Sequence, residues 1–299
     1  MPLNCLKRFS DWQMSDVMPH NPSVSSDTAS PYPYLYIYYL AGHQAVSEIA
    51  DFGEGFIGNW KEGDTAFLFF TEPADDAVQK FLADRPHLEL KDQFEMSYED
   101  WHGGPVIPFQ AGGFHVVPPW AQTPASRGED VLLLDPGVVF GAGNHPTTRH
   151  CLMAIGALTA EKSIGTVLDL GAGTGLLAIA AAKRGAASVF AVDNNFLAAR
   201  TALANIRQNR LTDRVFSVAG DARDFVDSPA DLVVANIHYA VMQQLVQSKG
   251  FQEKKWFILS GLMRTQARLI KDRLAHCRAD ILDEWIQDGI WHTVFGKMN

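Results

Sequence analysis

The stretch VLDLGAGTGLLAIAAAKRG (167–185) decides the fold, because it joins a short apolar strand to an apolar helix through closely spaced glycines. Such glycines permit a tight turn and let the backbone approach a bound ligand. The next predicted strand, ASVFAVD (187–193), ends in Asp193. An acid at that position accepts hydrogen bonds from the hydroxyls of a ribose. The stretch therefore predicts a strand–turn–helix unit that binds a nucleoside.

The spacing of the glycines favours S-adenosylmethionine over a dinucleotide. Gly171, Gly173 and Gly175 form GxGxG rather than the GxGxxG that receives a pyrophosphate. S-adenosylmethionine has no phosphate, and its cationic head suits an acid such as Asp169, which lies just before the turn. Asp221, at the end of the third predicted strand, is placed to meet the adenine amine. Tight turns and helix caps alone are the alternative explanation of these residues.

Strands and helices alternate regularly around this unit, which predicts a parallel, doubly wound Rossmann-like α/β sheet over residues 131–299. In such a sheet, ligands bind at the carboxyl ends of the strands. The predicted strands cover 129–135, 166–170, 187–193, 215–221, 231–237, 255–261 and 291–297. The predicted helices cover 147–158, 176–185, 195–209 and 262–275.

The preceding part of the chain predicts a second, smaller domain. Strand patterns at 34–42 and 65–72 alternate with helix patterns at 43–53 and 75–84, which suggests a ferredoxin-like α/β domain over residues 33–92. A chain of 299 residues suits two domains. A Gly- and Pro-rich segment over 93–130 is expected to be a linker with irregular strands. Within it, Trp101 and Trp120 are interpreted as packing anchors rather than substrate contacts. Residues 1–32 are polar and rich in Pro and Ser, so a disordered extension is expected.

Charge and cysteine content narrow the class of protein. A net charge of −9 argues against sequence-independent binding of DNA, which needs a basic footprint. Cys5, Cys151 and Cys277 are scattered, which favours free thiols over disulfides or a metal site. The N-terminus shows no signal-peptide core, and no apolar run has membrane-spanning length. We therefore expect a cytoplasmic protein, taken as a monomer, without a metal.

A second glycine-rich stretch, DPGVVFGAGNHPTT (135–148), precedes the first and carries a family resemblance. Together with VLDLGAGTG, DLVVANI (231–237) and ILSGL (258–262), in this order, it resembles the ribosomal protein L11 methyltransferases, the PrmA type. The resemblance covers residues 95–299 well. It implies S-adenosylmethionine-dependent methylation of lysine or N-terminal amines of a ribosomal protein, with the smaller domain recognising that substrate.

The resemblance also implies the site. It implies cofactor contacts at Thr148, Gly171, Asp193 and Asn236, with Phe140 and Gly141 lining the same pocket. Gly173, Asp169 and Asp221 are expected contacts from the glycine-rich turn and the strand ends themselves. The upstream loop is expected to fold over the donor. His145, which precedes Pro146, is expected to cap the following helix, since Pro suits a first helical turn. A role for His145 as a base is the alternative.

Two catalytic roles are predicted at the end of the fourth strand of the main domain. Asn236 is expected to accept a hydrogen bond from the incoming amine, and His238 is a candidate proton acceptor against the plainer reading of a surface histidine. The family usually has threonines where this chain has Ala142 and Asn144, and Asn-Ile-Leu-Ala becomes Asn-Ile-His-Tyr at 236–239. These departures bear on the substrate more than on the reaction.

Other functions compatible with the sequence are methylation of another protein's lysine, as in methyltransferases of the electron-transfer flavoprotein β-subunit, and methylation of a small amine. A donor-binding but inactive adaptor would not need an Asn on the acceptor side. An NAD-dependent oxidoreductase is disfavoured by the glycine spacing and by the FGxGxHPTT pattern.

Overall fold

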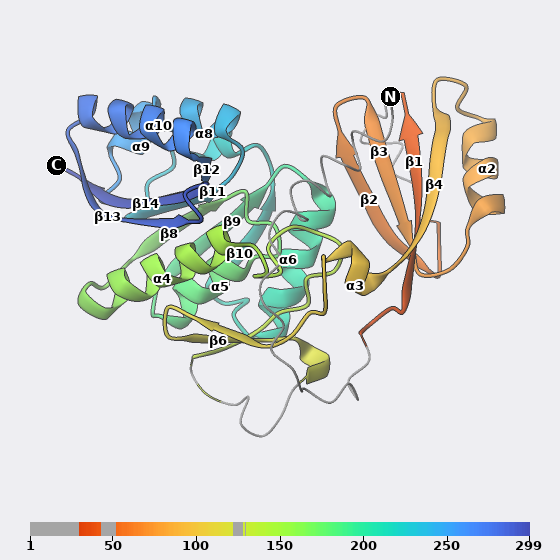
Figure 1. The fold of residues 1–299 in the computed structure, drawn as a ribbon, viewed down its shortest axis with the longest axis horizontal. Coiled ribbons are helices and arrows are strands. Elements are labelled where there is room, and N and C mark those ends of the chain that lie inside the picture. The colour runs from red at the N-terminus through yellow and green to blue at the C-terminus, as the bar shows by residue number, and fades with distance from the viewer. Residues whose placement is uncertain (1–29, 43–51, 122–127, 129) are drawn as a thin grey trace. The chain divides into compact units, whose positions relative to one another are not determined.

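The computed structural model describes residues 30–42, 52–121, 128 and 130–299. The chain divides into two compact units, Met1–Val106 and Ile107–Asn299, each of which is drawn in Figure 1. The extension predicted for residues 1–32 lies almost wholly outside the described residues, and so does the helix predicted over 43–53.

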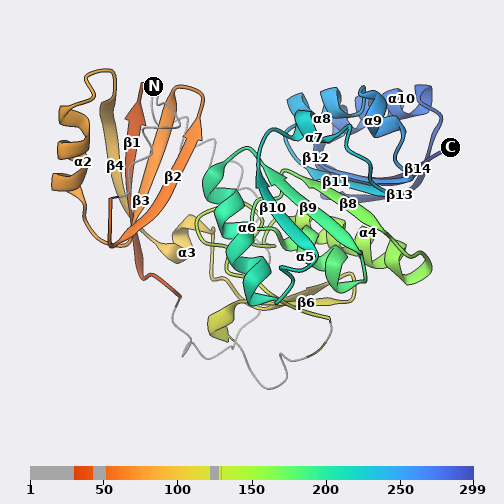
Figure 2. The ribbon, with the colours of Figure 1, turned by 180° about the vertical axis from the view of Figure 1, so that it is seen from behind.

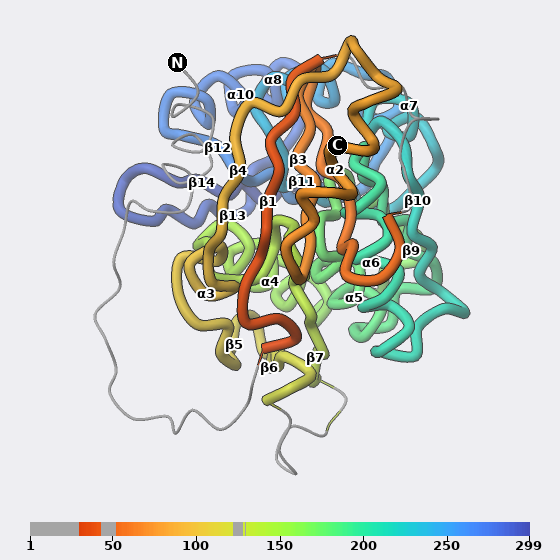
Figure 3. The backbone as a smooth tube through the Cα atoms, turned by 90° about the vertical axis from the view of Figure 1, so that its right-hand side faces the viewer, coloured from red at the N-terminus to blue at the C-terminus, as the bar shows by residue number. Residues whose placement is uncertain are grey.

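In its described residues, the first unit contains a four-stranded antiparallel sheet with the helix α2 packed against it. Its sheet order is β2-β3-β1-β4, and Figure 3 shows β1 between its neighbours β3 and β4. This is the strand order of a ferredoxin-like sheet, as predicted. Apolar residues of the helix, Val78 and Phe81, pack on Leu40 and Leu68 of the sheet. The elements are β1 (Tyr34–Ala41), β2 (Phe56–Glu62), β3 (Thr65–Phe70), α2 (Asp75–Ala83), β4 (Glu89–Ser97) and α3 (Tyr98–Trp101).

Strand β4 places the end of this unit later than residue 92, where the predicted domain ended. Its sequence, ELKDQFEMS, is mostly polar because β4 is an edge strand whose side chains are largely exposed. Leu90, Phe94 and Met96 fall at period-2 spacing, but Asp92 interrupts this pattern and weakens the strand signal. Trp101, just after β4, packs edge-to-face on Phe69 with ring centroids 5.2 Å apart. Its predicted role as a packing anchor is confirmed.

The second unit begins with a small three-stranded sheet of order β5-β6-β7. Its strands are β5 (Phe109–Ala111), β6 (Phe114–Val117) and β7 (Val131–Leu133), and the short helix η2 covers Pro119–Ala121. The strand predicted over 129–135 is thus β7 of this small sheet and does not join the main sheet. A three-residue apolar strand carries no signal that tells which sheet it enters.

The main sheet has seven strands in the order β10-β9-β8-β11-β12-β14-β13. Neighbours from β10 to β12 run parallel, whereas β14 is antiparallel to both β12 and β13. The predicted fold class is confirmed, and the unpredicted β13 completes a hairpin with β14. The strands are β8 (Thr166–Leu170), β9 (Ser188–Asp193), β10 (Val215–Ala219), β11 (Leu232–Asn236), β12 (Trp256–Met263), β13 (Ala279–Gln287) and β14 (Trp291–Met298).

Helices cover both faces of the main sheet, as Figures 1 and 2 show. Along β11, Leu232 and Val234 enter one buried cluster, while Val233 and Ala235 enter the other. The first cluster includes residues of α4 and α5, and the second includes residues of α8 and α10. The helices are α4 (Pro146–Glu161), α5 (Leu176–Lys183), α6 (Phe196–Gln208), α7 (Ala222–Phe225), α8 (Tyr239–Leu245), α9 (Lys249–Gln252) and α10 (Arg264–His276).

The order of the strands fixes where a ligand can bind. The chain runs outward from β8 through β9 to β10 and then returns to β11 on the other side of β8. This reversal opens a crevice at the carboxyl ends of β8 and β11, where ligands of such sheets bind. Gly171 directly follows β8 and Asn236 ends β11. The topology therefore brings both predicted residues to one edge of the sheet.

Candidate functional site

The glycine-rich turn after β8 has a backbone that only glycine adopts comfortably. Gly171, Gly173 and Gly175 have φ angles of 78°, 53° and 78°. A Cβ on Gly173 would lie 2.4 Å from the carbonyl oxygen of Phe140. The glycines thus let the turn bend and also let the upstream loop come close to it.

Asp193 shapes this turn from the end of β9. Its Oδ2 accepts a hydrogen bond from the backbone N of Gly173 at 2.9 Å, and its Oδ1 accepts one from Asn195 N at 2.9 Å. Burial raises the pKa of this carboxyl, and the two backbone donors act in the opposite direction. Each carboxylate oxygen has a second lone pair, so the group can still accept hydrogen bonds from ribose hydroxyls.

The upstream glycine-rich loop is hydrogen-bonded to the turn. The carbonyl of Phe140 accepts from Thr174 N at 3.1 Å, and the carbonyl of Gly141 accepts from the Thr174 hydroxyl at 3.0 Å. Gly141 has a φ of 108°. Phe140 is half-buried there. The second loop thus lies directly against the first, which explains why both are glycine-rich.

Two buried asparagines that were not predicted, Asn205 within α6 and Asn209 directly after it, hold the start of that loop. Asn205 accepts from Asp135 N and donates to the carbonyls of Asp135 and Thr174, each at 2.9 Å. Asn209 makes the same pair of bonds with Leu133, at 3.0 and 2.7 Å. One amide therefore joins both loops. The available signal was a pair of amides four residues apart on the buried face of an apolar helix.

Three of the predicted residues keep a buried oxygen that has no hydrogen-bond partner among the described residues: Thr148 Oγ1, Asp169 Oδ1 and Asn236 Oδ1. Buried polar atoms are nearly always paired, so unpaired ones at one edge of a sheet call for a ligand. Acceptors of this kind fit the ammonium head of S-adenosylmethionine and an incoming amine. The residues present therefore fit that donor, with Asp193 and the glycine-rich turn on its nucleoside part.

Asp169 is almost fully buried within β8, and its environment is unusual for a carboxylate. Its Oδ2 accepts from Ala178 N at 3.0 Å. Burial raises the pKa of Asp169 to about 7, the bond from Ala178 lowers it, and the charge of Asp193 raises it further. A cationic group beside the free oxygen would stabilise the ionised form.

Donor binding is therefore expected to release a proton from Asp169 in acidic solution. Because the ammonium head lowers the pKa of Asp169, binding releases a proton when the pH is below about 7. Affinity for S-adenosylhomocysteine should rise about tenfold per pH unit up to about pH 7 and then level off. Calorimetric titration between about pH 5.5 and 7.5, below the pKa of the ligand's own amine, measures this. Asp169→Asn should abolish the slope, and a flat wild-type profile would contradict the assignment.

For Asp221 and His238, the structure shows surroundings but no contact that tests the predicted role. Asp221 caps α7, and both carboxylate oxygens accept hydrogen bonds from the Arg223 guanidinium. The Arg223 hydrogen bonds hold the pKa of Asp221 below its usual range. His238 is exposed at the start of α8, where its carbonyl accepts from Val241 N. Contact of Asp221 with adenine and proton transfer by His238 stay predictions.

His145 caps α4, as predicted. Its Nδ1 accepts from Thr147 N at 3.4 Å, and Pro146 follows at the first helical position. The imidazole packs on the ring of Trp291 with centroids 4.6 Å apart. Burial, with a smaller contribution from His150, lowers the pKa of His145 to about 4. The ring is therefore neutral at physiological pH, and its Nδ1 is already engaged.

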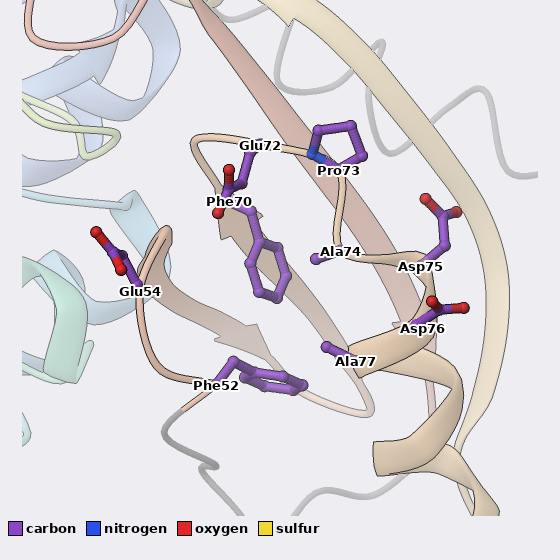
Figure 4. Close-up of a pocket in the computed structure, with 9 residues that line it drawn as sticks. All are labelled: Phe52, Glu54, Phe70, Glu72, Pro73, Ala74, Asp75, Asp76 and Ala77. Atoms are coloured by element: carbon purple, nitrogen blue, oxygen red, sulfur yellow. The ribbon is translucent and has the colours of Figure 1, made fainter.

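The first unit has a hollow of its own, of about 420 Å³. The rings of Phe52 and Phe70 form part of its wall, and Figure 4 shows carboxyl groups around them. Those acids are Glu54, Glu72, Asp75 and Asp76. None of the residues predicted for the donor lies in this lining.

Among the helices described, none has the length and apolarity needed to cross a membrane. Within the same residues, no three His, Cys, Asp or Glu side chains are grouped so that they could hold a metal ion.

The doubly wound sheet with its GxGxG turn has the architecture typical of a class I methyltransferase domain. The family model for "Ribosomal protein L11 methyltransferase (PrmA)" matches residues 66–299. The chain belongs to the ribosomal protein L11 methyltransferase (PrmA) family.

Relatives and a solved structure agree with this assignment. The chain is 36% identical over 185 residues to a ribosomal protein L11 methyltransferase of Clostridium botulinum, covering 61% of this chain but only 58% of the relative. It is 31% identical over 221 residues to one of Streptococcus equi subsp. zooepidemicus, covering 70% of this chain and 67% of the relative. The crystal structure of a ribosomal protein L11 methylase from Lactobacillus delbrueckii subsp. bulgaricus matches with a TM-score of 0.55 and 28% identity, over 64% of this chain and 100% of that chain.

Proposed function

We propose that this protein transfers methyl groups from S-adenosylmethionine to lysine side chains and the N-terminal amine of ribosomal protein L11. The observation that carries the proposal is Asn236 Oδ1, a buried acceptor at the end of β11 that no described residue pairs with. It lies at the same sheet edge as the glycine-rich turn. The family to which the chain belongs supports the choice of substrate.

Because the methyl group is already activated, the protein mainly has to align the amine with it and exclude water. S-adenosylmethionine supplies an electrophilic methyl group on a sulfonium. The amine lone pair forms the N–C bond while the C–S bond breaks, its electron pair goes to sulfur, and the amine proton leaves to water. A free lysine has a pKa of about 10.4, so a buried setting has to favour the neutral amine. Asn236 Oδ1 accepts one N–H and so turns the lone pair toward the methyl group.

The first unit is proposed to hold the protein substrate, since a separate α/β unit is not needed to bind a small amine. In this proposal, residues 33–92 form most of the substrate-recognition domain. Residues 131–299 form the domain that binds S-adenosylmethionine. A ribosomal protein as substrate places the reaction in the cytoplasm. A monomer is sufficient for this activity.

The test is methylation of purified ribosomal protein L11 by the full chain with S-adenosylmethionine, followed by mass spectrometry of the intact protein and its peptides. Mass increments of methyl groups on lysines or the N-terminus are expected. The alternative acceptors, another protein's lysine and a small amine, are included as parallel substrates. Methylation of one of these but not of L11 would replace the proposed substrate while keeping the reaction. No methylation of any acceptor, with S-adenosylhomocysteine still bound, would support an inactive adaptor instead.

A further inference from the structure

Thr147 stands between two side chains that come from different elements of the site. It is the second residue of α4 and fully buried. Its Oγ1 lies 2.7 Å from the Nδ1 of His145 and 3.3 Å from the Nδ2 of Asn236. The hydroxyl therefore joins the helix cap to the residue proposed to meet the amine.

The direction of these hydrogen bonds follows from the cap. His145 Nδ1 already accepts from the backbone N of Thr147, so it carries no proton. Burial lowers the pKa of His145 to about 4, which keeps the ring neutral. A threonine hydroxyl has a single hydrogen, and the short contact places it on His145 Nδ1. The Thr147 oxygen then has only lone pairs left for Asn236, and it accepts from Nδ2.

The consequence is a fixed orientation of the Asn236 amide. With Nδ2 bound to Thr147, the carbonyl Oδ1 faces the other way, where it is buried and has no partner. Gly261 leaves the room in front of this oxygen, since a Cβ there would lie 3.0 Å from Oδ1. If the amide were reversed, its NH₂ group would face the incoming amine, and two donors would oppose each other.

We propose that Thr147 is a positioning residue for methyl transfer: bound to His145, it orients the Asn236 amide so that Oδ1 accepts from the substrate amine. This inference rests on the proposed function. Thr147 touches neither the methyl group nor the amine and acts only through Asn236. Its neighbour Thr148, whose own hydroxyl is unpaired, is the one expected to contact the donor.

The test compares Thr147→Val, which keeps the shape but loses the hydroxyl, with Thr147→Ser, which keeps the hydroxyl. The Val variant should have a kcat about tenfold below wild type, because the loss of one hydrogen bond has an effect of about that size. Its melting temperature and its affinity for S-adenosylhomocysteine should stay near wild type. The Ser variant should keep kcat within about twofold of wild type. Equal losses in both variants would indicate a packing role and overturn the proposal.

A double-mutant comparison separates orientation from general damage. In an Asn236→Ala background, Thr147→Val should lower kcat no further, whereas an additive loss would contradict action through Asn236. His145→Phe, which keeps a ring against Trp291 but removes the acceptor, provides the second route if the Val variant does not fold. It should lower kcat without weakening donor binding, and an unchanged kcat would overturn the proposal. Failure of the proposed function appears already in the wild-type protein, whereas failure of this inference appears only in the variants.

Discussion

Asn236→Ala is expected to lower kcat for methylation of ribosomal protein L11 by about 100-fold or more, with little change in the melting temperature. The alanine removes the acceptor that aligns the amine, and a misplaced nucleophile costs about that factor. Affinity for S-adenosylhomocysteine should fall less than kcat, because the turn after β8 and Asp193 are unchanged. Single-turnover rates at saturating donor measure the chemical step directly.

Gln247→Ala is a suitable control, because it also removes a side-chain amide but lies exposed beyond α8. It should leave the rate unchanged. If Asn236→Ala methylates at the wild-type rate, Asn236 has no role in aligning the amine, and the inference about Thr147 is lost with it. A fall in affinity equal to the fall in kcat would instead make Asn236 a donor contact only.

Asp193→Ala is expected to weaken binding of S-adenosylhomocysteine by about 100-fold or more. The variant loses the ribose contacts and the bond to Gly173 N that holds the turn. Two charge-assisted hydrogen bonds at about 1.5 kcal/mol each give about 3 kcal/mol, which is about two decades in Kd. Calorimetric titration measures the change, with NAD as the comparison ligand, for which we expect no binding.

The matched control is Asp224→Ala, which removes an exposed acid from α7 and should leave the affinity unchanged. Near-normal binding of S-adenosylhomocysteine by Asp193→Ala would show that Asp193 does not hold the donor. Tight binding of NAD by the wild type would contradict the choice of cofactor itself.

Much of the main sheet could be predicted because its central strands are buried on both faces. β8 and β11 are apolar runs that end in a glycine-rich turn and in Asn236, and such runs stand out in a sequence. β4 and β13 could not be predicted in the same way. Both are edge strands with mostly exposed side chains. The apolar alternation that identifies a strand is broken at Asp92 in β4 and at the register irregularity between Ile281 and Asp283 in β13.

Part of the candidate site could also be predicted from the sequence. Asp169, Asp193, Thr148 and Asn236 were predicted from their places in local motifs. The structure shows Asp193 bonded to Gly173 of the turn and Asp169 in β8 just before it, whereas donor contacts of all four stay predictions. The roles of Thr147, Asn205 and Asn209 were not predicted. Each acts through side-chain bonds to residues tens of positions away, and no local pattern reports such a partner.

The sequence by itself determined the family, the class of ligand and the strand–turn–helix unit, because glycine spacing and apolar runs act through local backbone geometry and burial. Only the tertiary structure decided how the two glycine-rich loops meet at Thr174, and which way the amide of Asn236 faces. Hydrogen-bond direction depends on which donors and acceptors face each other in space. That pairing arises only when α4, α6 and the ends of the parallel strands have packed together.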